Sequence, residues 1–213
     1  LEDVSEIMHA LADVGLTSRE ACGNTVRNVM CSPLSGVCEE EKFDATPYAL
    51  GVAKFLLRNP LNQALPRKFK FNFTCCEKHG MIRIVDVGLL PQIQEIDGQK
   101  QKGFKIFLGG GLGNRSFIGH QLEEFTSVED LLYTSMAVLR IFDRMGDRKN
   151  MARNRMRYLV NDMGWEKFQN LVLKERALVK ATQSVIVKLR IDDAESEIKR
   201  SISVNNELSS VPD

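Results

Sequence analysis

The chain has 213 residues, of which 43% are hydrophobic and 27% charged, and its formal net charge is +1. This composition is ordinary for a globular protein and excludes long disorder, a collagen-like repeat and a disulfide scaffold. The small net charge predicts no nucleic-acid or membrane partner. The sequence has no apolar run of about 18 residues, so no membrane-spanning helix is expected.

The N-terminal part is predicted to be helical and then irregular. The chain starts at Leu1 rather than Met and opens directly in an amphipathic pattern, so we expect further sequence upstream. Apolar residues at helical spacing predict a helix over 3–14, followed by Gly15 at the position of a C-cap glycine. Residues 17–20 are a candidate start of a short second helix. Residues 22–46 have no clear period and are predicted to be an irregular loop.

The middle of the chain is predicted to form strands. Pro47 suits a first helical turn and indicates a helix over 47–58. Residues 67–74 alternate in polarity, which predicts a strand with one apolar and one cationic face. The apolar face carries Phe69, Phe71 and Phe73, and the other face carries Lys68, Lys70 and Asn72. Further strands are predicted over 81–87 and 104–108.

The C-terminal part is predicted to be mainly helical. Helices are expected near 127–144, 148–163 and 165–180, with glycines between them, and a last strand over 184–191. Strands in the middle and helices at the end predict an α+β fold, with a mixed or antiparallel sheet, flanking helices and a C-terminal helical segment.

Two groups of basic residues are candidates for anion binding. Lys68 and Lys70 are two residues apart in a strand, so their side chains point to the same face. With Arg27 they would form an anion site of one bidentate guanidinium and two point charges, although solvated charges on an exposed strand are the alternative. Residues 140–157 contain seven basic and two acidic residues, which indicates either a solvated helix face or a basic wall facing a polyanion.

The glycine run Gly109–Gly113 follows a predicted strand, an arrangement that can present backbone N–H groups to an anion. The dinucleotide fingerprint G-x-G-x-x-G is not met, because Asn114 and Ser116 occupy the sixth positions. A nicotinamide- or flavin-binding Rossmann unit is therefore not predicted. The simpler interpretation of the run is a tight connection with positive backbone φ.

The five cysteines are Cys22, Cys31, Cys38, Cys75 and Cys76. Their odd number and the absence of a secretory signal favour a reducing compartment, so the cytoplasm is the expected location and a plastid the alternative. Their spacing does not match a zinc ribbon, and we predict structural thiols with no metal ligand among them. A metal-binding regulatory domain that uses Cys31, Cys38, Cys75 and His79 is the alternative.

Several segments together resemble one known family. They are Ala21-Cys22-Gly23-Asn24-Thr25-Val26-Arg27-Asn28-Val29, Leu65-Pro66-Arg67-Lys68-Phe69-Lys70, Asp86-Val87-Gly88, Gly109-Gly110-Gly111-Leu112-Gly113 and the basic residues 144–160. In order and spacing they resemble the first of the two repeats of the nitrite/sulfite reductase family. Its members use sirohaem coupled to a 4Fe–4S cluster, and the resemblance runs from Leu1 to about Arg176.

The resemblance implies an oxidoreductase that reduces nitrite or sulfite by multi-electron transfer, with ferredoxin or a flavoprotein as electron donor. It assigns Arg27, Lys68 and Lys70 to the binding of the small oxyanion substrate. The residues that it places around sirohaem are Asn28, Arg67, Gly110, Gly111 and Arg153. The family's cluster cysteines, spaced C-x5-C and C-x3-C, belong to its second repeat, so we expect the cluster ligands mainly outside this chain.

The same resemblance implies a division of the chain into three parts. Residues 1–20 would be the end of a ferredoxin-like half-domain, 21–180 the sirohaem-pocket repeat, and 181–213 a strand and linker toward a second repeat. Such a fragment is expected to be inactive alone. The alternative is a non-catalytic module of the same fold that binds an anion or a tetrapyrrole, or pairs with another subunit.

Overall fold

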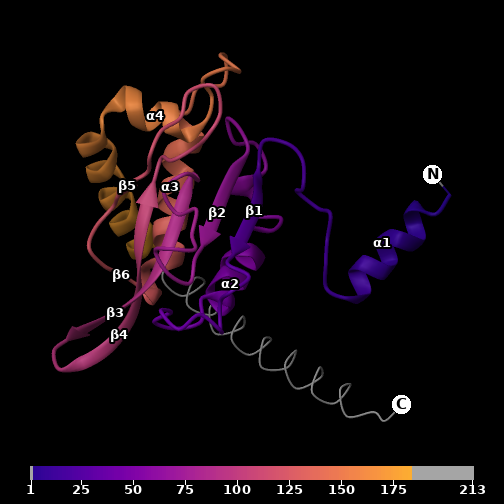
Figure 1. Cartoon of the computed structure of the whole chain (residues 1–213). Coiled ribbons are helices and arrows are strands. Elements are labelled where there is room, and N and C mark those ends of the chain that lie inside the picture. The colour runs from indigo at the N-terminus through magenta and orange to yellow at the C-terminus, as the bar shows by residue number, and fades with distance from the viewer. Residues whose placement is uncertain (1, 184–213) are drawn as a thin grey trace, which may run out of the picture.

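A computed structural model describes residues 2–183, and a mixed six-stranded sheet lies at the centre of this part of the chain (Figure 1). The strands are β1 (Val26–Cys31), β2 (Phe69–Phe73), β3 (Val87–Ile96), β4 (Gln99–Leu108), β5 (His120–Gln121) and β6 (Thr126–Ser127). Their order is β1-β2-β3-β4-β5, and β6 also pairs with β4. β1, β2 and β3 are parallel, whereas β4 is antiparallel to β3, β5 and β6.

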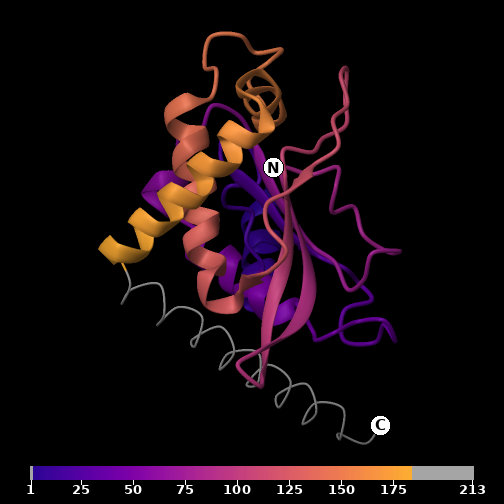
Figure 2. The same cartoon turned by 90° about the vertical axis from the view of Figure 1, so that its left-hand side faces the viewer.

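The helices that follow α1 flank this sheet. In chain order the helices are α1 (Val4–Asp13), α2 (Thr46–Leu56), the short 3-10 helices η1 (Pro60–Asn62) and η2 (Val128–Asp130), α3 (Leu131–Met145), α4 (Met156–Met163) and a helix over 165–183. α2 lies in the crossover from β1 to β2, which two parallel strands require. Figure 2 shows the helix over 165–183 lying across α3 on the side away from the sheet. This arrangement confirms the predicted α+β class.

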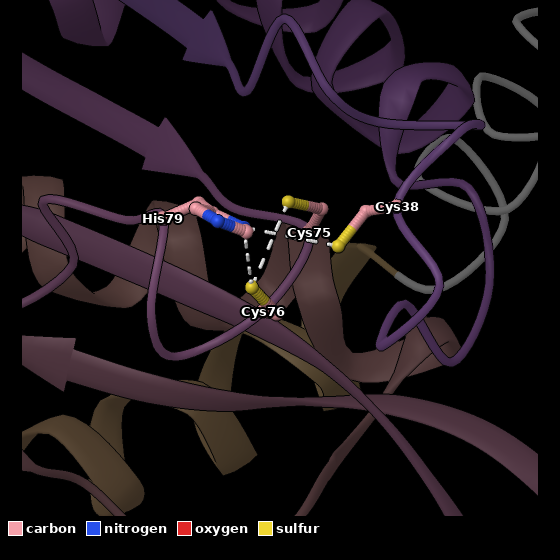
Figure 3. Close-up of side chains that lie close together, drawn as sticks. All are labelled: Cys38, Cys75, Cys76 and His79. Carbon is pink, nitrogen blue, oxygen red and sulfur yellow. Dashed lines mark hydrogen bonds between the residues drawn. The ribbon is translucent and has the colours of Figure 1, made fainter.

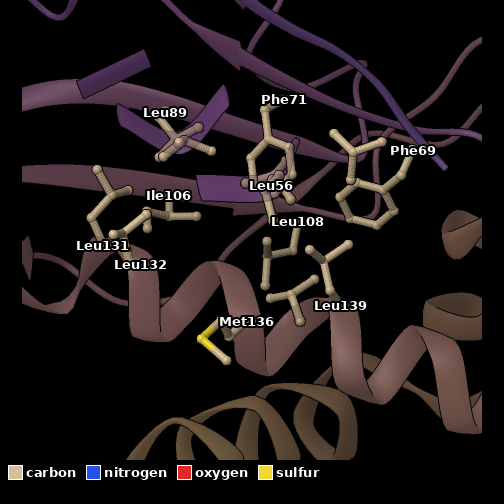
Figure 4. Packing of buried hydrophobic residues seen from close by; sticks show 14 of the residues in the cluster. Leu56, Phe69, Phe71, Leu89, Ile106, Leu108, Leu131, Leu132, Met136 and Leu139 are labelled. Carbon is tan, nitrogen blue, oxygen red and sulfur yellow. The ribbon is translucent and has the colours of Figure 1, made fainter. Parts of the chain in front are cut away.

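One hydrophobic core joins the sheet to α2 and α3. Phe69, Phe71 and Phe73 are all fully buried, as the alternation in β2 predicted. Figure 4 shows Met136 and Leu139 of α3 below Phe69 and Phe71 of β2. Burying a side chain of this size stabilises the fold by about 1.5–3 kcal/mol, so this face of the sheet fixes the register of β2.

The second face of the sheet is covered by chain without regular structure. Residues 81–85, predicted to belong to a strand, form turns instead, and β3 begins only at Val87. Ile82 packs with Leu90 and Phe107 in a second small cluster. A Cβ on Gly88 would lie 1.9 Å from the Ile82 carbonyl oxygen, so this glycine permits the turns to pack directly on the strand.

Two other boundaries differ from the prediction. The segment 22–46, predicted to be irregular, contains the edge strand β1, which has a polar and half-buried face that gives no clear alternation. The helix predicted to begin at 148 begins at Met156, because Asp147 accepts hydrogen bonds from the backbone N–H groups of Lys149 and Asn150 and holds a turn there.

The hairpin β3–β4 extends further than predicted. Asp97 and Gly98 both have positive φ at its tip (52° and 73°), which is the geometry of a two-residue type I′ turn. Residues 17–20 form no helix. The strand predicted over 184–191 lies outside the described residues.

α1 stands apart from the sheet (Figure 1), and none of its residues is buried. The helix predicted over 3–14 is thus present, but its apolar side is exposed, with Ile7 56% accessible. Among residues 2–183 no helix is both long enough and apolar enough to cross a bilayer.

Candidate functional site

The cationic residues singled out in the sequence lie at one edge of the sheet. β1, β2 and β3 are parallel and begin at this edge, and the antiparallel β4 ends there. The edge therefore collects Arg27 and Lys68 from strand starts, Asp86 just before β3, and the glycine run just after β4. Segments far apart in the sequence meet here because strand direction alone brings their ends together.

Arg27 occupies a bulge in β1. The pairing of β1 with β2 passes from Val26↔Phe69 directly to Asn28↔Lys70, so Arg27 is the extra residue. A bulge redirects a side chain relative to the regular pleat, and bulges are frequent beside active sites. The Arg27 Nε donates a hydrogen bond to the Gly23 carbonyl oxygen at 2.9 Å, which holds the base of the guanidinium. Asn28, expected beside the cofactor, is exposed on the same strand.

Lys68 is half-buried among other cations. Its pKa is lowered, first by burial and then by the positive charges of Arg155, Arg27, Lys70 and Arg67. These charges destabilise the protonated amine, and an anion bound between them would relieve the repulsion. The structure thus brings together all three residues predicted to bind substrate. Among residues 2–183 none of those three makes an ion pair with a carboxylate.

Asp86 connects several segments at this edge through hydrogen bonds. Its side chain is fully buried, and its Oδ2 accepts hydrogen bonds from the Arg155 Nη2 at 2.7 Å and from the Lys70 backbone N–H at 3.1 Å. Its backbone oxygen accepts a bond from the Gly109 N–H at 3.0 Å. Burial raises the pKa of Asp86, while the Arg155 guanidinium acts in the opposite direction. One residue therefore ties β2, the end of β4 and the basic segment before α4 together.

Several buried polar atoms at this edge have no partner among the described residues. They are Asp86 Oδ1, Arg155 Nε, Arg157 Nε and Nη1, Asn154 Oδ1 and Thr25 Oγ1. Arg157 is only 6% exposed, and its guanidinium lies over the Tyr158 ring at 4.8 Å. A buried donor without an acceptor costs about 1–3 kcal/mol, and more if it is charged. Anionic groups of a bound molecule are the natural acceptors for these guanidinium N–H groups.

The glycine run Gly109–Gly113 allows close packing at this site because glycine has no side chain. A Cβ on Gly111 would lie 3.0 Å from the Arg157 Nη1, and one on Gly110 would lie 2.2 Å from the Arg83 carbonyl oxygen. The Gly111 N–H donates a hydrogen bond to the Phe117 carbonyl oxygen at 3.0 Å, so this backbone amide already has a partner. Gly111 instead leaves space for Arg157.

Of the basic residues that the resemblance assigned to the substrate or the cofactor, Arg153 alone pairs with a carboxylate within residues 2–183. Its Nη2 donates to both carboxylate oxygens of Asp162, at 2.7 and 2.8 Å, on the exposed surface. The sequence identified the basic segment but did not show which of its arginines are buried. Arg155 and Arg157 are the two that the structure places at the edge of the sheet.

A second constellation lies at the opposite ends of β1 and β2. The thiols of Cys38, Cys75 and Cys76 and the imidazole of His79 point toward one another (Figure 3), and their ligand atoms all lie within 4.8 Å of one another. The sequence showed these residue types but not that two separate loops bring them together. Cys31, considered with them, lies outside the group, and its pKa is raised by burial.

Comparisons of the sequence with known proteins find nitrite and sulfite reductases. The sequence model described as "Nitrite and sulphite reductase 4Fe-4S domain" matches residues 22–180. An assimilatory ferredoxin-dependent nitrite reductase of Haloferax mediterranei is 34% identical over 82% of this chain and 30% of its own length. A sulfite reductase [ferredoxin] of Mycolicibacterium paratuberculosis is 30% identical over 90% of this chain and 34% of its own length.

A solved structure supports the same assignment. The NirA protein of Mycobacterium tuberculosis superimposes with a TM-score of 0.74 at 28% identity, covering 83% of this chain and 32% of that one. The chain spans about a third of the length of these relatives. The matched region includes the whole sheet and both groups of candidate ligands. The chain belongs to the nitrite and sulphite reductase 4Fe-4S domain family.

Proposed function

We propose that this chain supplies the cationic substrate clamp and part of the sirohaem pocket of a larger protein that reduces nitrite or sulfite. Membership of the family implies sirohaem and a 4Fe–4S cluster as cofactors. In that protein, residues 21–180 would form the sirohaem-pocket repeat, between the end of a ferredoxin-like half-domain at 1–20 and a linker at 181–213.

The observation that carries this proposal is the set of cations and unpartnered guanidinium N–H groups at one edge of the sheet. Sirohaem carries many carboxylates, and this donor set fits such a group: Arg155 and Arg157 would hold its carboxylates, with Arg67 and Asn28 nearby. Bound there, sirohaem would supply an iron centre that accepts electrons and binds the substrate oxyanion. A fixed positive lining stabilises negative charge without reorganisation, which is the most effective form of electrostatic catalysis.

Arg27, Lys68 and Lys70 would bind the substrate anion. This assignment is supported by the bulge at Arg27 in β1 and by the two-residue spacing of Lys68 and Lys70 at the start of the neighbouring strand. Reduction of either oxyanion consumes protons as well as electrons. The lowered pKa of Lys68 makes its ammonium a stronger acid, so this residue is suited to deliver a proton to the bound anion.

We propose ferredoxin as the electron donor, because the nitrite and sulfite reductases compared above are named for it. A flavoprotein is the alternative donor. Multi-electron reduction needs the cluster as well as the clamp. Residues 2–183 on their own are therefore expected to show no nitrite or sulfite reduction.

The test is to replace Lys68 or Lys70 by Met in the complete protein and to measure kcat and KM for nitrite and sulfite with reduced methyl viologen. Each variant should lose about 10²–10³-fold in kcat/KM, the loss typical of removing one group that stabilises transition-state charge. Lys100→Met is the matched control, because Lys100 is exposed near the tip of the β3–β4 hairpin.

Sirohaem content, followed by its visible absorbance, should stay at the wild-type level in both lysine variants. Wild-type kinetics in both variants would refute the clamp. A complete wild-type protein that binds sirohaem but reduces neither anion would instead favour the non-catalytic module.

A further inference from the structure

We propose that Cys38, Cys75, Cys76 and His79 bind one zinc ion at a closed structural site, separate from the 4Fe–4S cluster that the family implies. Cys38 comes from the loop after β1, and the other three residues come from the loop after β2. β1 and β2 are parallel, with Cys31 paired to Phe73, so the two loops leave the sheet at the same edge. The topology thus explains why residues 41 positions apart meet.

The distances suit a single metal ion. The Cys76 Sγ lies 3.0 Å and the Cys38 Sγ 3.9 Å from the His79 Nδ1, and the two adjacent sulfurs of Cys75 and Cys76 are 4.0 Å apart (Figure 3). In a tetrahedral zinc site, with bonds of about 2.3 Å to sulfur and 2.0 Å to nitrogen, ligand atoms stand roughly 3.5–3.8 Å apart. Three thiolates and one imidazole are also one of the ligand sets preferred by structural zinc.

The same distances do not suit a 4Fe–4S cluster. Such a cluster binds each thiolate through a different iron, so its ligand sulfurs stand roughly 6 Å or more apart. The four ligand atoms here all lie within 4.8 Å. A disulfide does not explain the group either, since its sulfurs would be about 2.05 Å apart and all five cysteines are free. The described residues therefore fit a mononuclear ion and not the family cluster.

The surroundings hold both loops in place. Lys78 forms an ion pair with Glu40, so the loop carrying Cys38 is attached to the loop carrying His79. The Ser32 hydroxyl lies 3.4 Å from the Cys75 sulfur, and the Thr74 hydroxyl donates to the Cys76 carbonyl oxygen at 2.9 Å. Partners of this kind orient metal ligands from outside the first coordination sphere.

The charge next to the site suits three thiolates. Three thiolates and a zinc ion carry a net negative charge, and the Lys78 side chain lies close to it. Cys75 and Cys76 are buried, whereas His79 is exposed.

The location indicates a structural role. Arg27 and Cys31 lie near opposite ends of β1, and four residues of strand span about 13 Å. The proposed ion is thus far from the substrate clamp, at the other edge of the sheet. With four protein ligands it has no open position for a water or a substrate, and its effect would be to join two irregular loops.

The first experiment measures zinc, iron and acid-labile sulfide per chain in the complete protein, purified without added metal. We expect about one zinc per chain, in addition to the iron of the family cofactors. Cys38→Ser and His79→Asn should each lower zinc at least about fivefold, with iron and sulfide unchanged. Cys22→Ser and His9→Asn are the matched controls, because both residues are exposed and lie outside the group.

The second experiment needs no variant and covers the case in which the variants fail to fold. X-ray absorption at the zinc edge of the wild-type protein should show about three sulfur neighbours near 2.3 Å and one nitrogen near 2.0 Å. A zinc shell of oxygen and nitrogen alone, or zinc at background level, would overturn the proposal. Loss of iron and sulfide in Cys38→Ser would also overturn it, in favour of a second iron–sulfur cluster. None of these readouts depends on reductase activity.

Discussion

The buried pair of Asp86 and Arg155 gives the sharpest stability prediction. The Asp86 carboxylate is fully buried, and the Arg155 side chain is 17% exposed, with the pair joined at 2.7 Å. Replacing Arg155 by Leu keeps most of the apolar stem but removes the charge that compensates the carboxylate. The only other described donor to that carboxylate is the Lys70 backbone N–H.

Removing one partner of a buried ion pair costs about 3–5 kcal/mol, because the other charge stays buried and unpaired. In a protein of this size each 1 kcal/mol lowers Tm by roughly 2–4 °C, so we expect Arg155→Leu to lower Tm by about 6–20 °C. Arg153→Leu is the matched control, since it breaks an exposed pair worth about 0–1 kcal/mol.

The loss should depend on pH with a defined sign. Without Arg155 the pKa of Asp86, already raised by burial, rises further above its unfolded value. A carboxyl group of this kind binds protons more tightly in the folded state, so its folded form gains stability as pH falls and loses it as pH rises through the folded pKa. The difference in unfolding free energy between wild type and Arg155→Leu should therefore shrink at acidic pH.

Urea unfolding of the complete protein across a pH series, followed by circular dichroism, measures this difference. The double variant Arg155→Leu/Asp86→Asn should recover most of the loss, because Asn accepts the Lys70 N–H without carrying a charge. A loss below about 1 kcal/mol, or one that stays constant with pH and in the double variant, would refute the reasoning.

Three further predictions concern single positions. The pKa of Lys68 is lowered, so this side chain loses its charge at a lower pH than a guanidinium does. Lys68→Arg in the complete protein should therefore move the loss of substrate affinity at alkaline pH to a higher pH. Gly110→Ala should destabilise by about 1–3 kcal/mol, since the new Cβ would lie 2.2 Å from the Arg83 backbone oxygen. Glu175→Gln should cost roughly 1–2 kcal/mol, because the buried carboxylate joins the helix over 165–183 to α3 through Arg144 at 2.5 Å.

Each of these has its own measurement. The pH dependence of KM for nitrite tests Lys68, and an unchanged alkaline limb in the arginine variant would contradict the assignment. Thermal unfolding tests the other two. Gly98→Asn is the control for Gly110, because Asn tolerates positive φ and nothing lies within 4 Å of the added Cβ. Glu166→Gln is the control for Glu175→Gln, because Glu166 is exposed on the same helix. If Glu166→Gln lowers Tm as much as Glu175→Gln does, the ion pair is not the cause of the loss.

The elements with strong periodicity were predictable from the sequence. The alternation in β2 identified both its buried phenylalanines and its cationic face, because each strand residue faces one side of the sheet. The segment before β3 was not predictable in this way. Its apolar residues suggested a strand, but Ile82 packs over the sheet from a turn, and only the close approach at Gly88 decides that arrangement.

The β3–β4 hairpin has a turn signal in the sequence, because Asp97-Gly98 favours a two-residue type I′ turn between two strands. β3 also includes Pro91, although proline cannot donate to a strand ladder.

The sequence by itself determined which residue types are available: an arginine in a segment predicted to be irregular, two lysines on one predicted strand, a basic segment, and five cysteines with a nearby histidine. Local spacing carries this information because side-chain direction repeats with the backbone. Only the tertiary structure decided which residues meet. The parallel pairing of β1 with β2 brings Arg27 to Lys68 at one edge and Cys38 to His79 at the other. Contacts of this kind depend on strand order and direction, which no local pattern encodes.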